Sequence, residues 1–249
     1  MRMFYSKALV NIFQLSLRDM DFSEVQLITF DCYGTLIDWE SGILAAFRVL
    51  LPNYEHVRNE QLLEMYGEIE VQLEAGPYLS YRTVLSRTAK EIGRRLGQEL
   101  AEDACQQFAE SLKQWPPFPD SVESLKKLAK HYRLGIISNT DDDLFAASHK
   151  LLQAPFDMIV TAQQVQSYKP SPRNFKEAMR RAGIPKANIL HAAQSIYHDI
   201  VPANSLGLKN IWVNRRFGKH GPGATVAADA KPGHEVRSLT ELAAALAPE

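Results

Sequence analysis

The sequence has few cysteines, no excess of charge of either sign and no long apolar segment. Cys32 and Cys105 lie far apart and lack the spacing of metal ligands, which argues against a disulfide framework and favours a reducing compartment. The 28 basic and 29 acidic residues leave a net charge of −1, which provides no electrostatic basis for binding nucleic acid. No segment approaches the roughly 18 apolar residues of a membrane span. We therefore expect a soluble, cytoplasmic protein that binds neither nucleic acid nor a membrane.

The chain does contain enough apolar residues for a sizeable core. Hydrophobic residues make up 45% of the 249 positions, which suits one domain with an insertion or two small domains. We interpret residues 1–20 as an amphipathic N-terminal extension, because Lys7 and Asn11 interrupt the apolar core that a secretory signal requires. Met20 could be the natural start, since the first predicted strand begins shortly after it.

Short apolar segments that end in polar turns alternate with helical patterns along most of the chain. This alternation predicts an α/β fold with a doubly wound parallel sheet, a Rossmann-like core. The strand-like segments lie within residues 25–30, 131–140, 156–161, 189–193 and 210–214, and the helical patterns cover residues 121–131, 142–152, 174–182 and 239–246.

Residues 41–115 interrupt the alternation with helical patterns alone. The predicted helices cover residues 43–51, 59–74, 79–96 and 101–113. We therefore expect an inserted helical cap domain over 41–115 and a core domain formed by 21–40 and 116–249. Because the insertion follows the first strand directly, it is placed to cover the polar end of the sheet. It could exclude water as a lid, or it could be a purely structural domain.

Polar residues follow the predicted strands at the points where those strands end. They are Asp31, Ser138 with Asn139, Lys169, and Asp199. Each has an ordinary structural interpretation: Asp31 as a turn residue, Ser138–Asn139 as a helix N-cap, and Lys169 as a surface lysine. Because the carboxyl ends of parallel strands face one crevice, we expect these side chains to converge there.

Such a set of residues suits covalent catalysis by a carboxylate. Asp31 would attack the substrate to form an ester that water then hydrolyses. Ser138 and Asn139 would hold a substrate carboxylate or phosphate. Lys169 would lower the pKa of Asp31 and keep it ionised. Asp199 would orient Lys169 or activate the hydrolytic water.

The order and spacing of these residues resemble the four motifs of the haloacid dehalogenase superfamily. The motifs are Asp31-Cys32-Tyr33-Gly34-Thr35, Ser138-Asn139, Lys169-Pro170 and the segment from Gln194 to Asp199. The resemblance covers residues 25–214 and includes the helical cap. It implies that Asp31, Lys169, Asp199 and Thr35 are catalytic, and that Tyr33, Ser138, Asn139 and Ser195 bind the substrate.

Two substitutions indicate which branch of the superfamily the chain resembles. Phosphatases carry a second Asp two residues after the nucleophile, which protonates an alkoxide leaving group, whereas this chain has Tyr33. Phosphatases also use an acidic pair in the fourth motif to hold Mg²⁺, and Gln194 replaces its first member. The chain thus resembles the L-2-haloacid dehalogenases, which implies displacement of halide from a short L-2-haloacid, a small anionic substrate, without a required cofactor. A homodimer is plausible by the same resemblance.

Three positions depart from the dehalogenase pattern. Dehalogenases place a halide-contacting Arg in the first cap helices, but residues 65–70 contain none and are acidic. Arg82 could replace it or could be an exposed helix residue. Phe175 stands where such enzymes carry a Tyr and is interpreted as a core residue. His198, beside Asp199, could assist water activation or could be a buried structural histidine.

Two other functions are also compatible with these residues. One is a Mg²⁺-dependent phosphatase, in which Asp31, Tyr33 and Asp199 would bind the metal. The other is a homologue without catalytic activity that binds a ligand or a protein.

Overall fold

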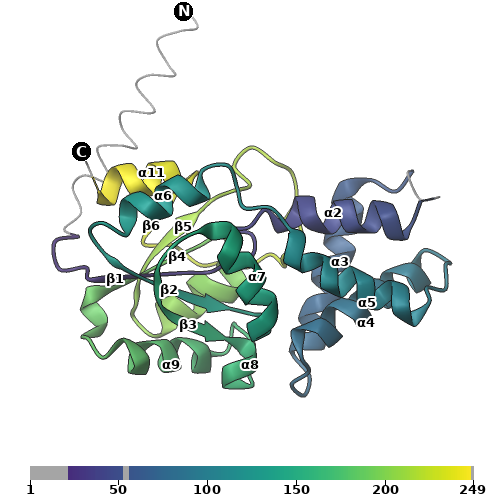
Figure 1. Ribbon diagram of the computed structural model, residues 1–249, viewed down its shortest axis with the longest axis horizontal. Helices are drawn as coiled ribbons and strands as arrows, with labels where there is room; N and C mark the ends of the chain where they lie inside the picture. Colours follow the sequence, from purple (N-terminus) through teal and green to yellow (C-terminus); the bar gives the residue numbers. More distant parts are fainter. Residues whose placement is uncertain (1–21, 53–55, 248–249) are drawn as a thin grey trace, which may run out of the picture.

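A computed structural model describes residues 22–52 and 56–247 of the chain (Figure 1). The predicted extension over residues 1–20 lies outside the described residues. Within the described ranges, no helix is long and apolar enough to cross a membrane.

The described residues form a six-stranded parallel sheet with the order β3-β2-β1-β4-β5-β6. The strand order reverses at β1, which has β2 on one side and β4 on the other, and this reversal creates the crevice in which α/β sheets bind ligands. The predicted doubly wound α/β class is confirmed. The strands are β1 (Leu27–Phe30), β2 (Arg133–Ser138), β3 (Phe156–Thr161), β4 (Ile189–Ala193), β5 (Lys209–Val213) and β6 (His234–Val236).

Helices cover both faces of the sheet, which explains why β1 is buried at every position. Alternate residues of β1 contribute to two separate hydrophobic clusters, with Ile28 and Phe30 on one face and Leu27 on the other. One face packs against α6 (Ser121–Leu128), α7 (Asp142–Leu152) and α11 (Leu239–Leu246), and the other against α9 (Pro172–Ala182) and α10 (Val201–Ser205). Short turns complete the core: α8 (Ala162–Val165), η2 (Lys186–Asn188) and η3 (Ile196–Ile200).

The remaining helices form a separate bundle beside the sheet, which we call the helical unit (Figure 1). Its centre is apolar and includes Phe47, Ile92 and Phe108. The first helix begins earlier than the predicted start at residue 43, because the Asp38 side chain accepts a hydrogen bond from the backbone of Ser41 and caps it. The elements are α2 (Trp39–Leu50), α3 (Asn59–Glu74), α4 (Tyr81–Arg95), α5 (Glu102–Ser111) and η1 (Leu112–Gln114).

The edge strand β6 was not predicted. Residues 214–233 pass over the helical unit before entering β6, and Ala224 is fully buried there. A Cβ atom on Gly67 would lie 2.7 Å from the carbonyl oxygen of Ala224, so only glycine permits this close approach of α3 to the segment. The Glu40 carboxylate accepts hydrogen bonds from Arg216 and from the Ala224 backbone, which ties the segment to α2.

Candidate active site

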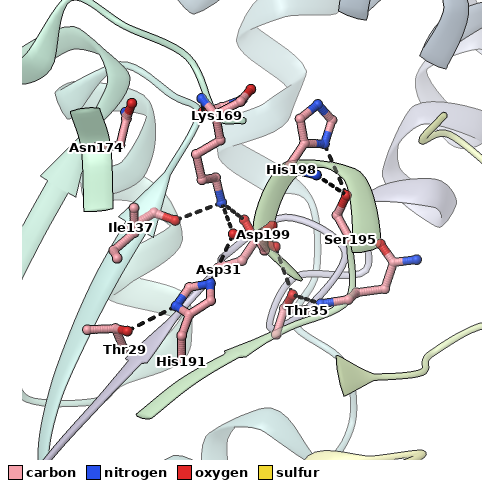
Figure 2. A network of polar contacts seen from close by, with 12 residues as sticks. Thr29, Asp31, Thr35, Ile137, Lys169, Asn174, His191, Ser195, His198 and Asp199 are labelled. Carbon is pink, nitrogen blue, oxygen red and sulfur yellow. Dashed lines mark hydrogen bonds and ion pairs between the residues drawn. The ribbon is translucent and has the colours of Figure 1, made fainter. Parts of the chain in front are cut away.

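Asp31, Lys169 and Asp199 meet at the carboxyl end of the sheet (Figure 2). Asp31 follows β1, Lys169 follows α8, and Asp199 lies in η3 after β4. The Lys169 ammonium donates to Asp31 Oδ1 over 2.8 Å, to Asp199 Oδ1 over 2.7 Å and to the Ile137 carbonyl oxygen over 2.9 Å. All three ammonium hydrogens therefore have acceptors. The structure brings together the three residues that the sequence proposes as the centre of catalysis.

Burial and the ammonium ion together set the charges of this cluster. Burial raises the pKa of Asp31 and the Asp199 carboxylate adds to the rise, while Lys169 and Thr35 oppose it without cancelling it. Burial acts in the same direction on Asp199, but Lys169 and His191 outweigh it and hold the pKa of Asp199 below its usual value. Burial opposes the charge of Lys169, yet the two carboxylates prevail and raise the pKa of the lysine. Lys169 thus acts on Asp31 in the predicted direction, but the net pKa of Asp31 is raised rather than lowered.

Thr35 and Gln194 fix the orientation of the Asp31 carboxylate. The Thr35 hydroxyl donates to Asp31 Oδ2 over 2.7 Å and accepts a hydrogen bond from the Gln194 backbone over 2.9 Å. The loops after β1 and β4 are thereby joined directly behind Asp31. Thr35 is fully buried and has no access to a substrate, so we assign it a positioning role.

His191 extends the cluster beneath Asp199 and was not anticipated. Its Nε2 lies 3.0 Å from Asp199 Oδ1, and its Nδ1 lies 2.9 Å from the Thr29 hydroxyl (Figure 2). The ring thus connects Asp199 to Thr29 through its two nitrogens. Phe175 packs edge-on against the ring at 5.0 Å, which agrees with its interpretation as a core residue. The available signal was a single histidine inside the otherwise apolar segment Ile189–Ala193.

Replacing His191 by phenylalanine should lower the free energy of unfolding by about 1–3 kcal/mol, because Asp199 Oδ1 and the Thr29 hydroxyl each lose a buried partner. Urea denaturation at pH 7 measures this loss. Thr29→Val is the matched control: it removes the contact with Nδ1 and a long hydrogen bond of 3.4 Å to the Leu190 carbonyl oxygen, but it keeps the bond between His191 and Asp199 and should cost less. An unchanged unfolding midpoint for His191→Phe would show that the ring merely fills space.

A small cavity of about 30 Å³ lies above Asp31, between the sheet and the helical unit. Ser138 lines it with a fully buried hydroxyl that has no hydrogen-bond partner among the described residues, so this hydroxyl is available to a ligand. The lining residues are Asp31, Tyr33, Trp39, Glu70, Glu74, Tyr81, Ser138, Asn139, Lys169, Gln194, Ser195, His198 and Asp199. Every predicted site residue except Thr35 contributes to this lining.

Two predicted substrate contacts are already engaged within the protein. The Tyr33 hydroxyl lies 3.0 Å from Ser148 Oγ on α7, and burial raises its pKa far above the usual range. Tyr33 therefore presents its ring to the cavity and supplies no proton. The Asn139 amide donates to Glu74 and to the Lys169 carbonyl oxygen, and its oxygen accepts from the Lys169 backbone. In this arrangement Asn139 holds Lys169 in place.

Ser195 and His198 form a pair at the start of η3. The Ser195 hydroxyl accepts a hydrogen bond from the His198 backbone over 3.0 Å and lies 3.2 Å from His198 Nδ1. Burial lowers the pKa of His198 to about 4, so the ring is neutral near pH 7. Its Nε2 lies 3.6 Å from Glu74 Oε2, beyond hydrogen-bond distance.

The helical unit contributes two carboxyl groups to the cavity, and these were also missed. Glu70 and Glu74 lie one turn apart on α3, and each side chain is 4% exposed. Among the described residues, the helical unit places no lysine or arginine in the cavity wall. Arg82, which the sequence left open as either a halide-contacting arginine or an exposed helix residue, pairs with Glu110 and Asp143 and does not line the cavity.

The donor set is poor for Mg²⁺, which prefers several free oxygen ligands. Both Asp31 oxygens accept hydrogen bonds, from Lys169 and Thr35, and only Oδ2 of Asp199 has no partner in the described chain. The Tyr33 hydroxyl is held by Ser148. Within residues 22–52 and 56–247, no group of three or more acidic, histidine or cysteine side chains has the arrangement of a metal site.

The chain is similar to known proteins over most of its length. Residues 28–213 match the family of haloacid dehalogenase-like hydrolases. The chain is 27% identical over 221 residues to an (S)-2-haloacid dehalogenase of Pseudomonas putida, which covers 88% of this chain and 95% of that protein. It is 35% identical over 103 residues to a glyceraldehyde 3-phosphate phosphatase of Methanothermobacter thermautotrophicus, covering 39% of this chain and 45% of that protein. Among solved structures, an L-2-haloacid dehalogenase superposes with a TM-score of 0.76 at 25% identity and covers 89% of this chain and 98% of its own.

Proposed function

Because the chain belongs to the haloacid dehalogenase-like hydrolase family, we propose that it displaces halide from a short L-2-haloacid and releases the 2-hydroxy acid. A carboxylate oxygen of Asp31 attacks C2 of the substrate. The carbon–halogen bond breaks, the halide departs with the bonding electrons, and C2 inverts. Water then attacks the carbonyl carbon of the aspartyl ester, which regenerates Asp31 and releases the product.

The observation that carries this proposal is a carboxylate nucleophile beside an ammonium ion, with no acid at position 33. Asp31 contacts Lys169 over 2.8 Å, whereas Tyr33 has its hydroxyl turned to Ser148. An alkoxide leaving group gains roughly 10²–10⁴-fold from a general acid, but a halide needs no proton. The core of this site is therefore better suited to expelling halide than alkoxide.

Two unsatisfied polar atoms have roles in the same reaction. The buried Ser138 hydroxyl has no partner in the described chain and would donate to the substrate carboxylate. Asp199 Oδ2 likewise has no partner there, while Oδ1 is fixed by Lys169 and His191. A fixed carboxylate with one free oxygen is suited to accept a proton from the water that hydrolyses the ester.

The cavity sets a condition on substrate binding. Its free volume is only about 30 Å³, so we expect a bound haloacid to displace the helical unit relative to the sheet. Closure of the helical unit over the bound acid would exclude bulk water.

The test is chloride release from L-2-chloropropionate by the purified protein. We expect release from the L enantiomer only, with D-lactate as the product. A single turnover in ¹⁸O-water should place the label in the Asp31 carboxylate, because the water attacks the aspartyl carbonyl carbon. Label found only in the product would exclude the ester.

Phosphate ester hydrolysis forms the second arm of the test, since the local similarity to a glyceraldehyde 3-phosphate phosphatase favours it as the alternative. Mg²⁺-dependent phosphate release without any halide release would replace the proposed reaction. Activity in neither assay would favour a homologue that binds without turnover.

A further inference from the structure

Glu70 lines the same cavity as Asp31 and reaches it from the helical unit. Asp31 projects from the end of β1, whereas Glu70 projects from α3 of the helical unit, and both line the same small space. In a displacement at saturated carbon, the leaving group departs on the side opposite the attacking atom. A halide expelled by Asp31 therefore moves away from the sheet and toward the helical unit.

An ionised carboxylate in that wall would repel the departing anion. The helical unit supplies no lysine or arginine to the lining within the described residues, so a carboxyl group can assist departure only in its protonated form. A protonated carboxyl group is a hydrogen-bond donor and is compatible with an anion. Ionised carboxylates would also repel the carboxylate of the substrate, because four acidic side chains line the cavity that it enters.

The contacts of Glu70 leave one of its oxygens available for this purpose. Tyr66 and Tyr81 both donate to Oε1, over 2.8 Å and 2.7 Å, and their hydroxyl oxygens lie 3.3 Å apart. No hydrogen bond reaches Oε2 from the part of the chain that the structure describes. Glu74, in contrast, receives the Asn139 amide on both oxygens and is tied to the core.

The surroundings of Glu70 bring the titration of its carboxyl group into the neutral pH range. Burial raises the pKa of Glu70 to about 7, the two tyrosine hydroxyls oppose the rise, and the Asp31 carboxylate adds to it. Burial and the Glu70 charge also raise the pKa of Glu74 well above its usual value. The other ionisable groups around the cavity are Lys169, Asp199, Tyr33 and the neutral His198. The positive charge of Lys169 opposes the rise in the pKa of Glu74, but the ammonium itself donates its hydrogen bonds to Asp31 and Asp199.

We propose that the Glu70 carboxyl group, held by Tyr66 and Tyr81, donates a hydrogen bond from Oε2 to the leaving halide. This inference rests on the proposed dehalogenation. Asp31 forms the new bond to C2, the carbon–halogen bond breaks, and the halide takes the electron pair while Glu70 keeps its proton. Glu70 is then a catalytic residue in the helical unit, in a role that a cationic side chain could otherwise fill.

The experiment is the pH profile of single-turnover chloride release from L-2-chloropropionate, from pH 5 to pH 9. In the unmodified protein the rate should fall about tenfold per pH unit above about pH 7, as Glu70 loses its proton. Ionisation of Asp31 would make the rate rise with increasing pH, whereas ionisation of Glu70 would make it fall. The direction of the pH dependence therefore distinguishes Asp31 from Glu70. Glu70→Gln keeps an N–H donor at every pH and should remain active with the fall near pH 7 removed. Glu70→Ala should lose about 10²-fold at pH 6.

Glu74→Gln is the matched control, one helical turn away, and should retain the fall near pH 7. Thermal denaturation of each variant verifies that it is folded. Glu70→Gln with the same decline above pH 7 as the unmodified protein would overturn the role of Glu70 and leave the dehalogenation standing. No chloride release by the unmodified protein at any pH would overturn both proposals.

Discussion

Asp31→Asn should abolish turnover, with a loss of about 10⁴-fold or more in chloride release, because the variant lacks the carboxylate that forms the ester. The loss should appear equally in single-turnover and steady-state rates, since no intermediate forms. The amide oxygen should still accept a hydrogen bond from Lys169, whereas the amide nitrogen can only donate to the Thr35 hydroxyl, which now donates to Asp31. Chloride release, together with mass spectrometry to detect any reversion of Asn to Asp, measures the effect.

The same variant should be no less stable than the unmodified protein. Because burial raises the pKa of Asp31 in the folded state, the ionised carboxylate opposes folding at pH values above its usual pKa. Asparagine removes that cost, so the free energy of unfolding at pH 8 should be equal or higher, and the difference should shrink toward pH 4. A folded, stable and inactive variant would show that activity requires the Asp31 carboxylate although its burial lowers the stability of the fold. Retention of more than one per cent of the activity would contradict its role as nucleophile.

The core of the fold was predictable because its signals are local. Largely apolar segments such as Leu27–Phe30 are typical of strands covered on both faces, and helical patterns with an apolar stripe alternate with them. Strand β6 escaped prediction because its three residues, His234–Val236, follow a segment rich in glycine and proline and show no periodicity. Its position depends on pairing with β5, which is a long-range contact.

The centre of the site was predictable for a topological reason. Asp31, Lys169 and Asp199 are distant in sequence, but parallel strands deliver their carboxyl ends to one edge of the sheet. The direction of the Asp31 pKa shift was not predictable, because it depends on how completely the helical unit excludes water. The contact of the Asn139 amide with Glu74 was not predictable either, because Glu74 comes from another unit of the fold.

Glu70 and Glu74 show which signal was overlooked. Along α3 the buried positions include Leu63, Tyr66 and Gly67, and the helical repeat continues through 70 and 74. Glutamate at positions where an amphipathic helix requires apolar residues is unusual and indicates a function. The acidic character of residues 65–70 was recognised, but only as the absence of an arginine. Which surface α3 faces could not be inferred, because it depends on packing between the helical unit and the sheet.

Lys169→Met should cause the largest loss of stability of any single change at the site. The ammonium is 1% exposed and contacts both Asp31 and Asp199, so its removal leaves two buried carboxylates without a counter-ion. Breaking a buried ion pair in this way costs about 3–5 kcal/mol. Activity should fall as far as in Asp31→Asn, because Asp31 beside an unpaired Asp199 will hold its proton at neutral pH.

The pH dependence of the loss distinguishes charge from packing. In Lys169→Met, both carboxyl groups should have folded-state pKa values above their unfolded values, so the variant loses stability as pH rises and recovers it as pH falls toward 4. Urea denaturation at pH 5 and pH 8 should therefore show a much larger deficit at pH 8. Adding Asp199→Asn should restore part of the stability at pH 8 without restoring chloride release, because one buried charge is removed while Asp31 remains unpaired. An equal deficit at both pH values would mean that the methylene chain, and not the charge, stabilises the site.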